Sequence, residues 1–135
     1  MNKKMRLVLK ARARFLCEYC LSQEYFSPDP FEGDHIIATS QGGSDILDNL
    51  ALACSGCNGY KSGAISAIDP GTVQRVPLYN PRKDVWFDHF RWNENFTLII
   101  GISPTGRATV ERLKLNRVSV VNLRTVLFEV GEHPK

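Results

Sequence analysis

Two pairs of cysteines are the most distinctive feature of this 135-residue sequence. In each pair two residues separate the thiols, and no cysteine is left over. The four are Cys17, Cys20, Cys54 and Cys57. Four thiolates complete a closed tetrahedral zinc site, so the spacing predicts structural zinc. Two redox pairs, or four thiols that merely pack in the core, are the alternatives. Disulfides are disfavoured in a chain without a secretion signal.

Residues of types that can serve in a hydrolytic reaction lie between the cysteine pairs and just after the second pair. They are Asp34-His35, Gly42-Gly43, Asn49, Asn58 and Lys61. A neutral imidazole, with an ordinary pKa of about 6.5, can accept a proton from water near neutral pH. Carboxylate and amide oxygens are ligands of hard cations such as Mg²⁺. These residue types therefore suit a reaction that activates water beside a divalent ion.

The order of these residues, from Cys17 to about Lys61, resembles the HNH endonuclease family, the ββα-metal nucleases. The likeness is to the four-cysteine branch, in which zinc clamps the nuclease motif. It implies a small ββα-metal (His-Me finger) core. It also implies a metal-dependent endonuclease that hydrolyses phosphodiester bonds in DNA and leaves 5′-phosphate and 3′-hydroxyl ends. RNA stays open as a substrate.

The resemblance also implies a role for each motif residue. His35 matches the general base, Asp34 a metal ligand, and Asn49 the asparagine that braces the loop. Asn58 stands at the last motif position, where many members have His, so the sequence is an H-N-N variant. Two oxygen ligands leave room for water and phosphate, as Mg²⁺ prefers, whereas His would favour softer metals. We expect Mg²⁺ or Mn²⁺ for catalysis, held by Asp34 and Asn58, and Zn²⁺ for structure.

One geometric question accompanies this assignment. Neighbouring residues of a regular strand face opposite sides, so Asp34 and His35 could not share a pocket on an ideal strand. The strand is then irregular, which Gly33 would allow, or the site lies at the edge of the strand.

Two other functions compete with a nuclease. The first is a non-catalytic, zinc-containing module that binds nucleic acid, and the second is a purely structural zinc domain in a larger assembly. Cleavage in the presence of Mg²⁺, set against binding in the presence of a chelator, separates the first from a nuclease.

Basic residues are concentrated at the N-terminus. Residues 1–17 contain six basic residues and no acidic one, although the formal net charge of the whole chain is only +3. A cationic segment suits a polyanion such as DNA, although a solvated helix face is the alternative. The candidate contacts are Lys3, Lys4, Arg6, Lys10, Arg14 and, from the motif, Lys61, for which a surface lysine is the alternative.

Periodicity and turn residues predict an α+β protein. Within a motif core at 15–63 we expect an entering basic helix over 3–14, strands over 31–37 and 50–53, and a helix over 58–62. Over 64–135 we expect a connector at 64–84, a β-hairpin of 85–92 with 96–102, and helices over 106–115 and 117–130. Asn116 could cap the last helix.

Composition limits the class of protein. Hydrophobic residues make up 43% and charged residues 23% of the chain, which argues against disorder. The apolar run at 96–102 is far shorter than the roughly 20 residues of a membrane span. We therefore expect a soluble, cytoplasmic protein that folds as one HNH nuclease domain over 1–135. The sequence leaves its oligomeric state open.

Overall fold

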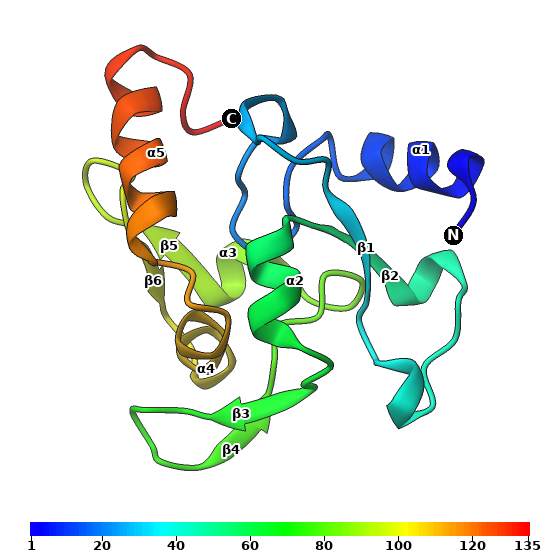
Figure 1. Ribbon diagram of the computed structural model, residues 1–135. Coiled ribbons are helices and arrows are strands. Elements are labelled where there is room, and N and C mark those ends of the chain that lie inside the picture. The colour runs from blue at the N-terminus through cyan, green and yellow to red at the C-terminus, as the bar shows by residue number, and fades with distance from the viewer. The chain divides into compact units, whose positions relative to one another are not determined.

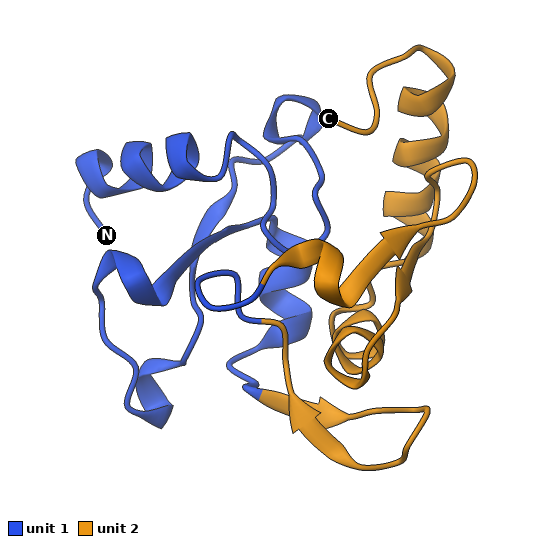
Figure 2. Ribbon diagram, turned by 180° about the vertical axis from the view of Figure 1, so that it is seen from behind, with its two compact units in different colours: residues 1–65, 80–84 blue, residues 66–79, 85–135 orange.

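The chain divides into two compact units. The computed structural model describes residues 1–135. Unit 1 comprises residues 1–65 and 80–84, and unit 2 comprises residues 66–79 and 85–135 (Figure 2). All four cysteines and all the motif residues belong to unit 1. The expectation of one domain over the whole chain stays a prediction.

Unit 1 is built on a β-hairpin followed by a helix (Figure 1). Its elements are α1 (Lys3–Arg12), β1 (Glu32–His35), β2 (Leu50–Ala53) and α2 (Ser55–Lys61). Short 3₁₀ turns cover Glu24–Phe26, Thr39–Gln41 and Leu47–Asn49. The strands are antiparallel, with Glu32 opposite Ala53 and His35 opposite Leu50. Strand, strand and helix follow one another as the ββα core requires, so the α+β prediction is confirmed.

The two faces of this hairpin meet different helices. A Cβ at Gly33 would lie 2.3 Å from the Met1 Cε atom and 3.4 Å from the Leu9 Cδ2 atom, so α1 packs closely on that face. Asp34, the next residue of β1, instead bonds to Lys61 of α2. Strand alternation therefore directs neighbouring residues of β1 toward two separate environments.

Helix α1 is capped at its first turn and bonded to the motif at its last residue. The Asn2 side chain accepts from the Met5 N–H at 2.8 Å and caps the first turn. Arg12 donates to the carbonyls of Leu47 and Leu50, which precede and begin β2. The helix ends at Arg12, two residues before the predicted end, because Arg14 adopts a left-handed conformation with φ of 57°.

Unit 2 contains two hairpins and three helices. They are β3 (Ser66–Ile68), β4 (Arg75–Pro77), α3 (Trp86–His89), β5 (Phe90–Trp92), β6 (Ile99–Gly101), α4 (Pro104–Leu113) and α5 (Val118–Glu129). Strands β3 and β4 pair antiparallel, as do β5 and β6. The two predicted C-terminal helices are confirmed, within two residues at each end. None of the helices of the chain is long and apolar enough to cross a membrane.

Three predictions for unit 2 are wrong. The 64–84 connector contains the β3–β4 hairpin. Residues 86–89, predicted as strand, form the helical turn α3 and bury Trp86. Asn116 does not cap α5, because its amide exchanges hydrogen bonds of 2.8 and 2.9 Å with the backbone of Ile99.

A charge pair connects the β3–β4 turn to α4. Arg107 donates from Nε and Nη2 to the two carboxylate oxygens of Asp69, each at 2.9 Å. Asp69 also accepts from the backbone N–H groups of Gly71 and Thr72. Its hydrogen bonds with Arg107 hold the pKa of the Asp69 carboxyl well below its usual range.

The Asp69→Asn variant tests this pair through the pH dependence of unfolding. A carboxyl whose pKa is lowered by folding stabilises fully above its unfolded pKa of about 3.9, and this contribution is lost as the pH falls through the folded pKa. We expect the variant to melt below the wild type at neutral pH, and the difference in Tm to shrink below about pH 4. Trp86 and Trp92 both lie in unit 2, so tryptophan fluorescence reports its unfolding. A difference that is independent of pH would contradict this.

Candidate active site and zinc centre

The four cysteine sulfurs form one cluster in unit 1. All four Sγ atoms lie within 4.8 Å of one another. Cys54 is the N-cap residue of α2, and Cys57 lies in its first turn. The Sγ atoms of Cys20 and Cys54 are 3.8 Å apart. Sulfurs around tetrahedral zinc, with bonds of about 2.3 Å, are about 3.8 Å apart. The cluster therefore fits a structural zinc ion.

The pKa directions of the four thiols differ in the absence of a metal ion. Burial raises the pKa of the Cys17 thiol, whereas hydrogen bonds with the other three thiols lower the pKa of Cys20. Four buried thiolates would repel one another, so all four ionise together only around a metal ion. Zinc binding is then coupled to proton release.

Asp34 occupies a closed, fully bonded position on the α2 side of β1. Its Oδ2 atom accepts from the Tyr19 hydroxyl at 2.7 Å. The Lys61 ammonium lies 3.3 Å from Oδ1 and 3.2 Å from Oδ2 of the same carboxylate. Burial and the Asp34 charge raise the pKa of Tyr19, which therefore stays a donor. Asp34 is only 5% exposed.

Lys61 is an internal counter-ion. It is 1% exposed, and its ammonium also donates to the His35 carbonyl at 2.9 Å. The expectation that Lys61 contacts nucleic acid, or is a surface lysine, is wrong for this reason. The Asp34 carboxylate thus joins three parts of the chain, namely the Cys17–Cys20 segment through Tyr19, β1, and α2 through Lys61.

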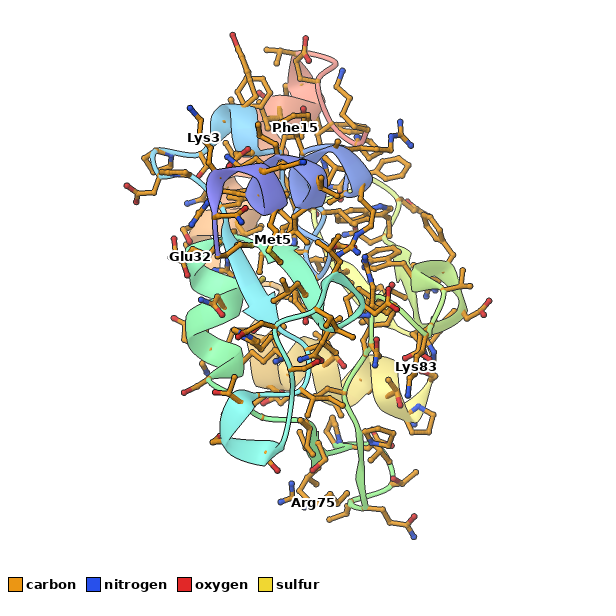
Figure 3. The ribbon with its side chains drawn as sticks, turned by 90° about the vertical axis from the view of Figure 1, so that its right-hand side faces the viewer. Lys3, Met5, Phe15, Glu32, Arg75 and Lys83 are labelled. Carbon is orange, nitrogen blue, oxygen red and sulfur yellow. The ribbon has the colours of Figure 1, made fainter.

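Asn58 lies on α2 next to a carboxylate that sequence reasoning did not single out. Its Nδ2 atom donates to Glu32 Oε2. Glu32 is exposed and lies beside α2 in Figure 3. Glu32 could have been identified from the sequence by its spacing of two residues from Asp34, because that spacing places the two carboxylates on one face of β1. Two carboxylates and one amide are the donors that Mg²⁺ or Mn²⁺ prefers. The chemistry of this donor set fits a hard divalent ion, although Lys61 already balances the charge of Asp34.

His35 lies on the opposite face, at the end of β1. Its Nε2 atom is 2.6 Å from Asp45 Oδ1, and its side chain is 34% exposed. The ring borders a hollow of about 290 Å³ lined by Met1, Met5, Gly33, Asp45 and Leu50. An ionised carboxylate can only accept, so Nε2 carries the proton and a neutral ring has its lone pair on Nδ1. The alternation of the strand is kept here, and Asp34 and His35 do not share a pocket.

The Asn49 side chain bonds to the loop that follows His35. Its Oδ1 atom accepts from the Ile37 N–H at 2.9 Å. Its Nδ2 atom donates to the carbonyls of Ile37 and Ser44, at 3.0 and 2.8 Å. Gly43 is held equally tightly, since a Cβ there would lie 1.7 Å from the Ile37 oxygen. These contacts make Asn49 a brace between the two ends of the loop.

The basic N-terminal residues differ in exposure. Lys3, Lys4 and Arg14 are exposed, and Arg6 is half-buried. Lys10 pairs with Glu24 at 3.0 Å, and its side chain is largely buried. In Figure 3 Lys3 lies on the outer side of α1 and Met5 on the side of the strands. The surface available to a polyanion is therefore the outer side of α1 and the turn after it.

Removal of zinc should unfold the motif of unit 1. A hairpin of four-residue strands and a seven-residue helix bury little apolar surface, so metal binding supplies much of their folding free energy. We expect one bound zinc per chain, and we expect Cys57→Ser or a strong chelator to remove it and to lower Tm. Ser55→Ala, an exposed position of the same helix, is the control. Colorimetric zinc release and circular dichroism measure both effects, and unchanged stability without zinc would overturn the assignment.

The Lys61→Met variant tests the buried charge pair. Removing one partner leaves the Asp34 charge uncompensated, which costs about 3–5 kcal/mol. Lys83→Met, at an exposed position of the same unit, should be nearly neutral. Denaturant unfolding of the zinc-loaded protein measures the free energy of unfolding. The double variant Asp34→Asn, Lys61→Met should lose less than the sum of the single variants. Additive losses, or equal stability of Lys61→Met and Lys83→Met, would contradict the pair.

A family model described as HNH endonuclease matches residues 17–63. No curated protein and no solved structure matches the chain. The matched segment contains both cysteine pairs, Asp34, His35, Asn49 and Asn58, and it coincides with the ββα part of unit 1. The HNH family comprises nucleases, so the match indicates a nucleic-acid substrate. Residues 17–63 of this chain are thus similar to the HNH endonuclease family over the whole ββα segment.

Proposed function

We propose that this protein is a metal-dependent endonuclease that hydrolyses phosphodiester bonds in DNA. The observation that carries the proposal is the match of residues 17–63 to the HNH endonuclease family. The accessible imidazole of His35 at the end of β1 supports it, because hydrolysis needs a base that both water and substrate can reach. The cysteine cluster would hold zinc as a structural ion and not as the catalytic one.

Asp34 and Asn58 would hold the catalytic Mg²⁺ or Mn²⁺, with Glu32 beside them. When bound, the ion supplies charge neutralisation on the phosphate and stabilisation of the leaving oxygen. The Lys61 ammonium would have to share the Asp34 carboxylate with such an ion, and one carboxylate cannot fully compensate both cations. Glu32, which is exposed, and Asn58, which is half-buried, are more accessible donors than the buried Asp34.

His35 would act as the general base. The oxygen of the attacking water bonds to phosphorus, the bond from phosphorus to the leaving oxygen breaks, and Nδ1 of His35 takes the proton of the water. The leaving oxygen receives a proton from solvent. The exposed Lys3, Lys4 and Arg14 would contact phosphates of the DNA backbone. The half-buried Arg6 would add a weaker contact. Such contacts position DNA without reading its sequence.

A nucleic-acid-binding module without catalysis is the second candidate. It is favoured by the closed position of Asp34, which is paired with Tyr19 and Lys61, and by the separation of Asp34 from His35 on opposite faces of β1. The two candidates predict the same affinity for DNA and differ in cleavage alone.

A supercoiled-plasmid assay with Mg²⁺ or Mn²⁺ tests the proposal. We expect the wild type to cut and His35→Ala to lose activity by about 10²–10⁴-fold, the share that a general base supplies. Affinity for DNA, measured in the presence of EDTA at fixed salt on the zinc-loaded protein, should be unchanged. Tyr25→Ala, which alters a side chain remote from His35 and 79% exposed, is a control for contaminating nucleases.

The other outcomes separate the candidates. If the wild type and His35→Ala both bind DNA and neither cuts with any divalent metal, the binding module is the better account. If both cut equally, His35 is not the base or the cleavage comes from a contaminant.

A further inference from the structure

We propose that Asp45 is a positioning residue that sets the tautomer and the orientation of the His35 ring. This inference rests on the proposed nuclease function and deepens it. The Asp45 carboxylate lies 2.6 Å from Nε2 of His35, a distance typical of a strong, charge-assisted hydrogen bond. Asp45 is not one of the motif residues Asp34, His35, Asn49 and Asn58. It borders the same hollow as His35.

The bond decides which nitrogen can act as the base. With Nε2 donating to Asp45, the lone pair of the neutral ring is held on Nδ1. Without the carboxylate, the neutral ring would exchange between two tautomers and two ring orientations. Only part of the population would then present an unprotonated Nδ1 to a water molecule.

The loop that carries Asp45 is held firmly enough for this role. Asn49 donates to the carbonyl of Ser44, the residue immediately before Asp45, and bonds to both backbone groups of Ile37. Ile37 lies two residues after His35. The Asn49 amide thus fixes Asp45 relative to the chain that carries the ring, so brace, carboxylate and imidazole form one continuous set of contacts.

A purely stabilising surface pair predicts a different result. The Asp45 side chain is 87% exposed, and exposed ion pairs contribute little to stability. Loss of Asp45 should therefore change stability little. If Asp45 positions the ring, its loss should lower kcat and leave the stability of the protein nearly unchanged. A residue that only supports the structure would not lower kcat in a folded protein.

The experiment compares the zinc-loaded full chain with Asp45→Ala, Asp45→Asn and Asp48→Ala. Asp48 is an exposed acid three residues further along the loop, so its variant matches the change in charge. We expect Asp45→Ala to lower kcat by about tenfold or more, part of the 10²–10⁴-fold that a general base provides. KM for DNA should stay equal or fall, as in Asp48→Ala, because each variant removes a negative charge. Asp45→Asn, whose amide oxygen can still accept from Nε2, should retain more activity than Asp45→Ala.

A second measurement does not depend on catalysis. Long-range nitrogen–proton NMR spectra of the histidine rings distinguish the two neutral tautomers, and His35 is assigned by loss of its signals in His35→Ala. We expect the Nε2–H tautomer in the wild type and in Asp48→Ala, and a mixture of tautomers in Asp45→Ala.

The results separate this inference from the proposed function. If the wild type cuts and His35→Ala does not, but Asp45→Ala turns over at the wild-type rate, the role of Asp45 is overturned. A wild-type tautomer in Asp45→Ala overturns it equally. If the wild type cuts no substrate, the nuclease function fails and the catalytic role of Asp45 fails with it, whatever the NMR spectra show.

Discussion

The buried pair between Lys61 and Asp34 is the interaction on which the geometry of unit 1 depends. The pair attaches the end of α2 to the middle of β1. The Tyr19 hydroxyl donates to the same carboxylate and so attaches the segment between Cys17 and Cys20. A buried charge must be compensated, so neither partner can be released without another charge in its place. Asp34 is therefore a structural residue in this arrangement and a metal ligand only where a second cation displaces the first.

The cysteine cluster and the charge pair act on the two ends of one short helix. A seven-residue helix does not hold its shape alone in water. In α2 the first turn carries Cys57, beside the N-cap Cys54, and the last residue is Lys61. Because both ends of α2 are fixed in this way, the helix holds the Asn58 side chain toward Glu32 without help from apolar packing of Asn58. This explains how so small a motif presents a defined set of oxygen donors.

Local signals in the sequence predicted most of unit 1, and distant partners explain what they missed. Cysteine spacing, strand periodicity and the loop asparagine are short-range features, and they predicted the cysteine cluster, both strands and the loop contact of Asn49. The burial of Lys61 could not be predicted, because lysines are rarely buried and its partner lies 27 residues away. The β3–β4 hairpin was hidden for another reason. Its strands have three residues each, and a proline ends β4.

The alternation of β1 constrains how any phosphate could meet both groups of residues. His35 and Asp45 lie on the α1 side of the hairpin, whereas Asp34, Glu32 and Asn58 lie on the α2 side. The hairpin has two strands, so one edge of β1 is not paired with another strand. Glu32 is the first residue of β1 and His35 the last, so at about 3.3 Å per residue the two positions are roughly 10 Å apart along the strand. A phosphate over either face reaches one group alone. The imidazole and the oxygen donors therefore lie apart both across the strand and along it, and a single phosphodiester could meet both only by lying along the unpaired edge of β1.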